Sequence, residues 1–220
     1  MKQRPAAFLL LNVDQLPEKQ YLLLEEALPP FRRERAQCYR RVEDRKNCTL
    51  SYCLLRYAIQ EQFGVQSIPQ LYTTDLGKLY FADRTMPYFN WSHCKKGVFC
   101  AVAEQEIGCD IQDKISNSRS LWRRCLHQQE QQQMPKTDDA FTKLWTLKES
   151  CLKYAGVGLH RDMRELDFSD CMQPCGSRTW EDAVLTWGHR AGLYYSVCAE
   201  AQAEIYEIDS GTLYQALCRK

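Results

Sequence analysis

The sequence predicts an α+β fold with largely antiparallel sheets. Segments with helical spacing are followed by a run of short strand-like segments, and the same order then occurs a second time along the chain. The chain has 220 residues, of which 45% are hydrophobic, so it can bury a core as one domain or as two small halves. A doubly wound parallel sheet would instead require strands and helices to alternate.

The first half begins with an apolar segment that we expect to be a buried strand, and helices then strands follow it. The longest helix repeats Leu50, Leu54 and Tyr57 at helical spacing and is expected to end at Gly64. Helices are expected at 18–28, 31–41 and 48–63, and strands at 6–13, 79–81, 88–91, 98–103 and 107–112.

The second half repeats this order with helices first. Thr137 can cap the N-terminus of its main helix, and Gly156 follows the end of that helix. Helices are expected at 120–134, 137–154 and 212–218, and strands at 166–168, 183–187, 193–199 and 204–208.

Composition limits the classes of partner and compartment. With 29 basic and 28 acidic side chains the formal charge is +1, so we expect no nucleic acid partner and no membrane partner. The apolar run near the start is interrupted by Asn12 and Asp14, and no stretch of eighteen apolar residues follows. The twelve cysteines are scattered beside apolar neighbours, which favours buried reduced thiols in a cytoplasmic protein over a disulfide framework.

A strand-like segment in the middle of the chain carries the first candidate site. In Ile107-Gly108-Cys109-Asp110-Ile111-Gln112-Asp113, strand alternation places Gly108, Asp110 and Gln112 on one face, and Ile107, Cys109 and Ile111 on the face toward the core. A carboxylate therefore projects from a buried strand. Taken alone, the segment still favours an ordinary exposed or edge-strand acid.

A second candidate site lies on the helix expected at 137–154. Glu149 and Lys153 are four residues apart, so they share a helix face, and Trp145 lies one turn earlier on the same side. The pattern places an acid and a base beside an aromatic wall. Spacing alone slightly favours an ordinary Glu–Lys pair, worth about 0.2–0.5 kcal/mol to the helix.

The segment Asn90-Trp91-Ser92-His93 is a third candidate. A histidine preceded by a hydroxyl can hold a phosphate through charge-assisted hydrogen bonds, although a locally satisfied turn histidine fits as well. The sequence has no Gly-x-x-x-x-Gly-Lys loop, no Gly-x-Gly-x-x-Gly after a strand and no Gly-x-Ser-x-Gly elbow. The common nucleotide-binding and hydrolase folds are therefore disfavoured.

These three motifs, in this order and at this spacing, are specific in combination. The last of them reads Trp145-x-x-Lys148-Glu149-Ser150-x-x-Lys153. Together the motifs resemble the surfactin-synthetase-activating type of 4'-phosphopantetheinyl transferases over most of the chain. The resemblance implies a pseudo-dimer of two similar α/β halves, 1–106 and 107–220, with the active site between them. The first half would contact the 3'-phosphate of coenzyme A, and the second would bind the metal and dock the carrier.

The resemblance also implies a reaction. A serine hydroxyl of an apo acyl or peptidyl carrier protein attacks the β-phosphorus of coenzyme A, takes up the phosphopantetheine arm, and releases adenosine 3',5'-bisphosphate. Such carriers serve fatty acid, polyketide or nonribosomal peptide synthesis. Because a chain with two halves can build the whole site, we expect a monomer.

Site residues follow from the resemblance, position by position. Asp110, Gln112 and Glu149 are implied as the ligands of Mg²⁺, a hard cation that prefers oxygen. Glu149, or a magnesium-bound water beside it, would take the serine proton, and Lys153 would neutralise charge on the phosphate oxygens. The family usually has a second acid where this chain has Gln112, so we expect weaker Mg²⁺ binding but retained catalysis.

Further positions match coenzyme A contacts in the family. Arg32 and Arg35 match phosphate-binding lysines, and guanidinium groups suit phosphate well. The remaining expected contacts are Lys78, Ser92, His93 and Lys153. Lys148 lies about 100° around the helix from Glu149, and we expect it either to be structural or to support the site from behind the residues that contact the ligand.

Two other classes of function remain open from the sequence. One is a protein that binds coenzyme A or a carrier without turnover, which Gln112 makes conceivable and which the intact Asp110, Glu149 and Lys153 argue against. The other is a Mg²⁺-dependent phosphotransferase acting on nucleotides, which the missing phosphate loop argues against.

Overall fold

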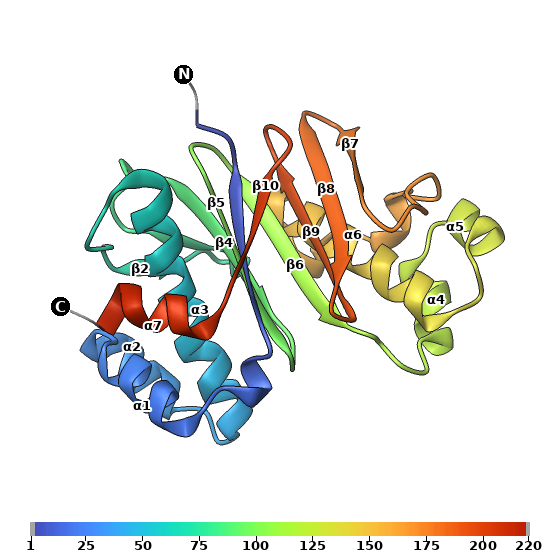
Figure 1. Ribbon diagram of the computed structural model, residues 1–220. Helices are drawn as coiled ribbons and strands as arrows, with labels where there is room; N and C mark the ends of the chain where they lie inside the picture. Colours follow the sequence, from blue (N-terminus) through green and yellow to red (C-terminus); the bar gives the residue numbers. More distant parts are fainter. Residues whose placement is uncertain (1–2, 219–220) are drawn as a thin grey trace.

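The protein consists of two four-stranded sheets and a small two-stranded sheet, with helices on the outer faces (Figure 1). The computed structural model describes residues 3–218, apart from the side chain of Leu159. The first elements are β1 (Ala6–Leu11), a 3-10 helix (Val13–Gln15), α1 (Glu18–Glu26), α2 (Pro30–Gln37), α3 (Val42–Phe63), β2 (Leu71–Thr73), β3 (Leu79–Phe81), β4 (Tyr88–His93) and β5 (Gly97–Ala103).

The remaining elements build the second large sheet and then return to the first. They are β6 (Ile107–Asp113), α4 (Arg119–Cys125), α5 (Gln128–Gln133), α6 (Asp138–Ala155), two 3-10 helices (Gly158–His160 and Met163–Glu165), β7 (Gly176–Trp180), β8 (Ala183–Arg190), β9 (Leu193–Ala199), β10 (Glu204–Ile208) and α7 (Ser210–Cys218).

Strand order shows which parts of the chain belong together. The first large sheet has the order β10-β1-β5-β4, and the second has β6-β9-β8-β7. All pairs are antiparallel except β1 with β10. The end of the chain, β10 and α7, therefore packs with first-half elements. The boundary expected between residues 106 and 107 falls in the connection from β5 to β6 and stays a prediction about domain organisation.

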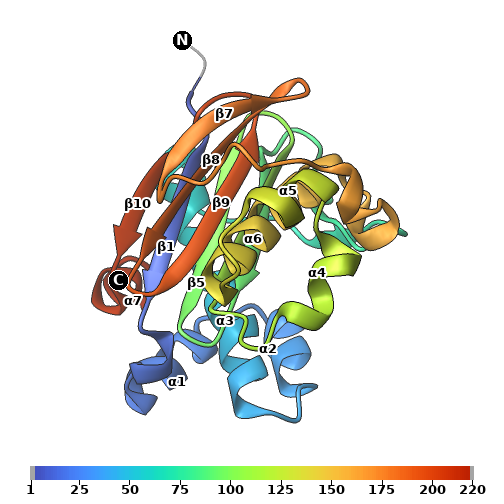
Figure 2. The ribbon, with the colours of Figure 1, turned by 90° about the vertical axis from the view of Figure 1, so that its right-hand side faces the viewer.

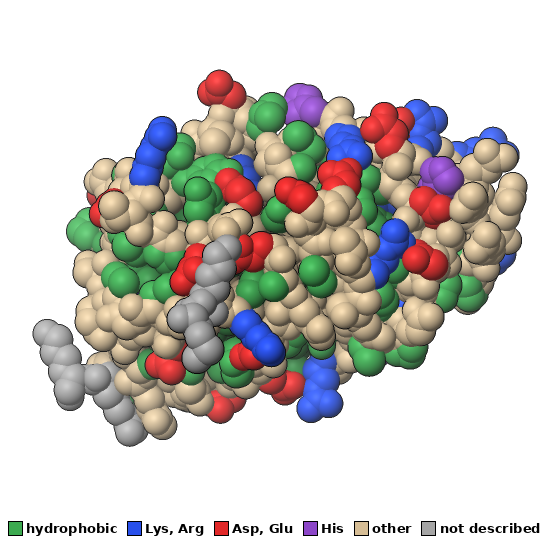
Figure 3. Space-filling view, turned by 90° about the horizontal axis from the view of Figure 1, so that it is seen from above, with side chains coloured by type: hydrophobic (Ala, Val, Ile, Leu, Met, Phe, Trp, Pro, Cys, Tyr) green, Lys and Arg blue, Asp and Glu red, His purple; other side chains and the backbone are tan. Residues whose placement is uncertain are grey.

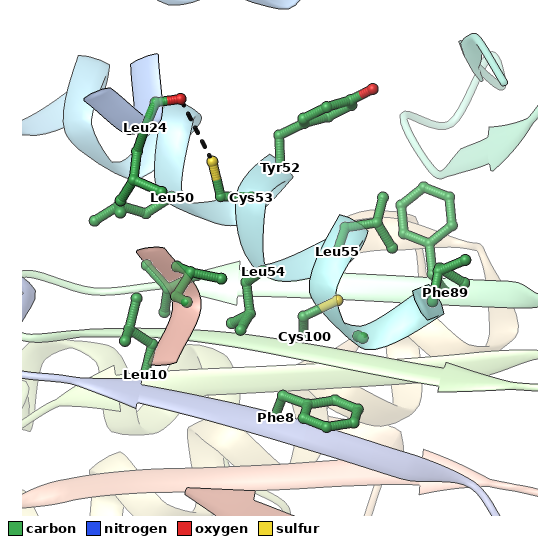
Figure 4. Packing of buried hydrophobic residues seen from close by; sticks show 14 of the residues in the cluster. Phe8, Leu10, Leu24, Leu50, Tyr52, Cys53, Leu54, Leu55, Phe89 and Cys100 are labelled. Atoms are coloured by element: carbon green, nitrogen blue, oxygen red, sulfur yellow. Dashed lines mark hydrogen bonds between the residues drawn. The ribbon is translucent and has the colours of Figure 1, made fainter. Parts of the chain in front are cut away.

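The layers are held together by three hydrophobic clusters. One lies between α3 and the first sheet and includes Leu54 (Figure 4). The middle cluster joins the two sheets through Phe99 and Ile111, and the third lies under α6 and includes Leu147. Figure 2 shows α4, α5 and α6 together on one side of the second sheet. The layer order is thus α3, first sheet, second sheet and α6.

Most elements predicted from the sequence are present, and the α+β class with largely antiparallel sheets is confirmed. Gly64 and Gly156 end their helices with φ of 68° each, and the Thr137 hydroxyl accepts a hydrogen bond from the N–H of Ala140 at 3.2 Å. The single helix predicted at 120–134 is wrong, because the chain is extended at Leu126 and a capping box restarts the helix at α5. The short strands β2 and β7 were not predicted.

The strand predicted at 166–168 is also wrong. The carbonyl of Leu166 accepts a hydrogen bond from Lys148 Nζ at 2.7 Å, and the N–H of Phe168 donates to Glu130 Oε1 at 2.9 Å. Because a buried ion pair occupies these backbone groups, they are not available for a sheet ladder. The apolar pattern that suggests a strand reflects burial of the segment in the core under α6.

Surface and thiol chemistry agree with the composition. Seen from above in Figure 3, acidic and basic side chains are interspersed on the visible face, as expected for a net charge of +1. Within residues 3–218, no helix has both the length and the apolar composition needed to cross a bilayer. All twelve cysteines are free thiols, and eight of them are buried.

Gly108 sets the distance between β6 and α6. A Cβ placed on Gly108 would lie 2.2 Å from the backbone oxygen of Ser150 and 2.2 Å from the backbone nitrogen of Tyr154, so the helix would have to move. Only glycine lets the two backbones approach this closely.

Replacing Gly108 by alanine should therefore destabilise the protein by at least the roughly 1–3 kcal/mol that an overpacked core costs. Urea unfolding measures the change. Gly97→Ala is the matched control, because its new Cβ would meet the movable side-chain methyl of Leu193 at 2.8 Å and no backbone atom closer than 3.4 Å. Equal losses for both variants would contradict the argument from backbone contact.

Candidate active site

The first and third motifs meet where the edges of the two large sheets come together. β6 is an edge strand of the second sheet and β4 an edge strand of the first. The Cys109 N–H donates to the Asn90 side-chain oxygen at 3.1 Å, which ties the two edges together. Asp110 follows directly, on the face that Gly108 leaves open to α6.

The Asp110 carboxylate binds side chains from all three motifs. It is 1% exposed, and its Oδ1 accepts hydrogen bonds from Ser92 Oγ at 2.7 Å and from Lys153 Nζ at 2.6 Å. Lys153 also donates to Ser92 Oγ at 3.1 Å. The three side chains form a closed triangle that links β4, β6 and α6, so Asp110 is not an edge-strand acid facing solvent.

Glu149 and Lys153 lie one turn apart on α6. The surroundings disfavour the charged form of Glu149 and favour the charged form of Lys153. Burial raises the pKa of the Glu149 carboxyl, an effect that Lys153 opposes and Asp110 reinforces. Burial lowers the pKa of Lys153, but neighbouring negative groups, Asp110 foremost, raise it by more, so the net shift is upward. Lys153 therefore stays charged at neutral pH, while Glu149 is a stronger base than an ordinary glutamate.

Gln112 is the third oxygen donor predicted for a metal, and it lies beside Asp110. Its amide nitrogen donates to Asp110 Oδ2 at 3.0 Å, so a half-turn of the amide would present its oxygen to the same place. Over residues 3–218, no group of three or more His, Cys, Asp or Glu side chains is arranged to hold a metal ion. The predicted set has only two such residues, Asp110 and Glu149, and its hard oxygen chemistry fits Mg²⁺.

A large cavity is lined by three of the residues predicted to contact coenzyme A. Its volume is about 550 Å³, and it is lined by Arg32, Arg35 and His93 among others. The Arg32 guanidinium lies over the rings of Tyr52 and Trp91, at 5.1 and 5.4 Å from their centroids. A ligand of nucleotide size fits such a volume.

Two residues that line this cavity each have a buried polar atom without a hydrogen-bond partner among the described residues. Arg32 Nε and Ser51 Oγ are buried and find no hydrogen-bond partner within residues 3–218. Buried donors of this kind cost free energy unless a ligand or water satisfies them. The cavity also contains one acid, Asp44.

His93, at the end of β4, also lines this cavity, which we call the arginine cavity after Arg32 and Arg35. Although the residue is exposed, partial burial of the imidazole lowers its pKa and the positive charge of Lys153 lowers it further, while Asp44 and Asp110 oppose the shift. His93 is therefore largely neutral at pH 7 and can donate one hydrogen bond to a phosphate without adding a full charge.

Lys78, which is predicted to contact coenzyme A, is paired with an acid of the protein. It lines a second cavity of about 170 Å³ together with Lys153, but its ammonium donates to Glu106 Oε2 at 2.5 Å and to the carbonyl of Tyr154 at 2.9 Å. Burial lowers the pKa of Lys78, and Glu106 opposes this shift. Glu106 also accepts a hydrogen bond from Tyr80 at 2.8 Å.

Of the two roles expected for Lys148, its contacts favour the structural one. It is 0% exposed, and its ammonium binds Glu130 at 2.7 Å together with two backbone carbonyls. Neither Glu106 nor Glu130 was singled out from the sequence. The available signals were slight: Glu106 directly precedes the strand that carries Asp110, and Glu130 lies at the third position of a capping box.

Comparisons with known proteins agree with these observations. Residues 106–203 match the family model described as the 4'-phosphopantetheinyl transferase superfamily. The 4'-phosphopantetheinyl transferase Sfp of Bacillus subtilis (strain 168) is 28% identical over 172 residues, which cover 70% of this chain and 77% of that protein. The 4'-phosphopantetheinyl transferase ffp of Bacillus subtilis is 26% identical over 168 residues, covering 68% and 75%.

A mammalian relative is similar over a comparable span. The L-aminoadipate-semialdehyde dehydrogenase-phosphopantetheinyl transferase of Mus musculus is 26% identical over 174 residues, covering 70% of this chain and 56% of the mouse protein. These matches confirm the resemblance drawn from the three motifs.

Proposed function

The chain is a relative of the 4'-phosphopantetheinyl transferases, with its residues 106–203 belonging to that superfamily, and from this premise we propose its reaction. It transfers the phosphopantetheine arm of coenzyme A to a serine of an apo acyl or peptidyl carrier protein and releases adenosine 3',5'-bisphosphate. The carrier serine attacks the β-phosphorus, the bond from that phosphorus to the bridging oxygen breaks, and the serine proton passes to a base.

The observation that carries this proposal is the cluster of Asp110, Ser92 and Lys153 beside Glu149. It lies close to both cavities, since Lys153 lines the smaller one and His93, next to Ser92, lines the larger. Leu79 and Trp91 line both cavities, so the two adjoin. An elongated ligand with a phosphate at one end and a pyrophosphate in the middle suits this arrangement.

Asp110, Glu149 and the amide oxygen of Gln112 would hold Mg²⁺. When bound, the ion would neutralise charge on the pyrophosphate and polarise the phosphorus that is attacked. Asp110 already has a positive partner in Lys153. The fit rests on the oxygen chemistry of these three side chains.

Glu149 and Lys153 would have different roles, one in proton transfer and the other in charge neutralisation. Glu149, whose pKa is raised by burial, would accept the serine proton. Lys153, charged at neutral pH, would move its hydrogen bonds from Asp110 and Ser92 to the phosphate oxygens on which charge accumulates. Phosphoryl transfer depends mainly on such positioning and charge neutralisation.

The test is intact mass spectrometry of an apo acyl or peptidyl carrier protein after incubation with this protein, coenzyme A and Mg²⁺, with an EDTA control. A mass gain equal to one phosphopantetheine, lost in EDTA, is the expected result. No gain across several carriers, combined with coenzyme A binding, would favour the binding protein without turnover. Competition by ATP but not by coenzyme A would favour a nucleotide phosphotransferase.

The arginine cavity predicts discrimination between coenzyme A and 3'-dephospho-coenzyme A. Arg32→Gln or Arg35→Gln should weaken coenzyme A binding about tenfold or more, since a charge-assisted hydrogen bond contributes about 1.5–3 kcal/mol. Binding of the dephospho form should hardly change. Calorimetric titration measures both. Arg40→Gln, an exposed arginine of the same basic segment, is the matched control. Equal losses for the two ligands would place the 3'-phosphate elsewhere.

We also propose a cytoplasmic monomer. The twelve free thiols suit a reducing compartment, and a single chain supplies every residue assigned to the site. Light scattering at assay concentration tests the oligomeric state.

A further inference from the structure

We infer that Glu106 is a positioning residue that shapes the coenzyme A cleft by holding Lys78, an inference that rests on the proposed function. Lys78 reaches across the molecule from the β2–β3 hairpin. Its ammonium contacts Glu106, in the connection before β6, and the carbonyl of Tyr154, near the C-terminus of α6. One side chain thus joins the hairpin, the link between the two sheets and the helix that carries the reactive groups.

The exposures of the two side chains show why Lys78 depends on Glu106. The Lys78 side chain is 5% exposed, whereas that of Glu106 is 40% exposed. A buried ammonium without a counter-charge is strongly unfavourable, so removing Glu106 would drive Lys78 out of its place. Glu106 is fixed in turn by the Tyr80 hydroxyl, which donates to its other oxygen at 2.8 Å.

The contacts of Lys78 with Glu106 and Tyr154 set the width of the smaller cavity. On the hairpin side this cavity is lined by Leu76 and Gly77, and on the side that follows α6 by Gly156 and Gly158. The two walls approach closely: a Cβ on Gly156 would lie 3.4 Å from Lys78 Cδ, and one on Gly158 would lie 3.5 Å from the carbonyl of Leu76. When Lys78 leaves Tyr154 and Glu106, the hairpin is free to separate from the helix end.

The positions of Lys153, Asp110 and Ser92 do not depend on the contact between Lys78 and Glu106. Lys153 is held by its own contacts to Asp110 and Ser92 on β6 and β4. Loss of Glu106 should therefore weaken the binding of coenzyme A and leave the transfer step itself nearly intact. A residue that acts in catalysis, or one that only supports folding, would not affect coenzyme A binding while leaving the transfer step nearly intact.

The experiment compares Glu106→Gln with the wild-type chain. Glutamine keeps the size of the side chain and an acceptor for Tyr80 but removes the charge. We expect the Kd and KM for coenzyme A to rise about tenfold, the usual scale for losing a hydrogen bond to a charged group, with kcat and the KM for the carrier little changed. Glu104→Gln, exposed in the same connection, is the matched control. Melting temperatures confirm that the variants are folded.

A double-mutant cycle tests whether Glu106 acts through Lys78. If it does, Lys78→Met with Glu106→Gln binds coenzyme A no more weakly than Lys78→Met alone. Additive losses, an unchanged Kd in Glu106→Gln, or a fall in kcat at constant KM would each overturn the inference. Failure of the wild-type chain to bind coenzyme A and to modify a carrier would overturn the proposed function, and this inference with it.

Discussion

Replacing Glu149 by alanine is expected to lower the rate of phosphopantetheine transfer at least about a hundredfold, the usual scale for losing one key electrostatic group. The carboxylate is proposed both to hold Mg²⁺ with Asp110 and to take the serine proton. Asp110 cannot also take over as the base, because it is proposed to hold Mg²⁺ itself and is paired with the positive charge of Lys153. Single-turnover transfer to an apo carrier, at saturating coenzyme A, measures the change.

Glu149→Gln separates the loss of charge from a loss of structure. Because the folded-state pKa of Glu149 lies above its ordinary value, ionising this group costs stability at every pH above that ordinary value. A neutral glutamine removes the cost, so this variant should melt no lower than the wild-type protein at neutral pH while losing activity to a similar extent. Near-normal turnover of either variant would remove Glu149 from the mechanism.

The parts of the site that the sequence predicts are those set by local periodicity. Strand alternation places Asp110 and Gln112 on one face of β6, and helical spacing places Glu149 and Lys153 on one face of α6. The structure brings these faces together because Gly108 lets the helix contact the strand directly. The same periodicities account for most of the helices and strands that were predicted.

The parts that the sequence could not predict depend on contacts between distant segments. The bond between Ser92 and Asp110 requires the edges of two different sheets to meet, which no spacing in the chain encodes. The partner of Lys78 is likewise a glutamate 28 residues away. Residues 166–168 look like a strand because their side chains are apolar, yet an ion pair elsewhere in the chain determines their backbone hydrogen bonds.

Breaking the ion pair of Lys148 with Glu130 is expected to cause the largest change in stability. Lys148 and Glu130 are both 0% exposed and lie 2.7 Å apart. Burial lowers the pKa of Lys148 and raises that of Glu130, so the charged pair is itself costly to bury. Its polar atoms are nevertheless satisfied: Lys148 also donates to the carbonyls of Met163 and Leu166. Removing one partner would leave an uncompensated buried charge.

Lys148→Met is therefore expected to lower the free energy of unfolding by about 3–5 kcal/mol, measured by urea denaturation. The matched control is Lys114→Met, which breaks the surface pair of Lys114 with Asp139, whose side chains are 51% and 47% exposed. That variant should lose no more than about 1 kcal/mol. Similar losses for the two variants would mean that burial does not distinguish the pairs.

The double variant Lys148→Met with Glu130→Gln separates the lost attraction from the stranded charge. Since it leaves neither position 130 nor position 148 ionised, it should be more stable than Lys148→Met alone, although it has lost more of the native interactions. If it were less stable, the hydrogen bonds of Glu130 to the backbone of His127 and Phe168 would contribute more than relief of its charge. In that case the segment that ends near Phe168 would be held mainly by hydrogen bonding, and Lys148 would serve chiefly to satisfy the carbonyls of Met163 and Leu166 beneath the helix that carries Glu149.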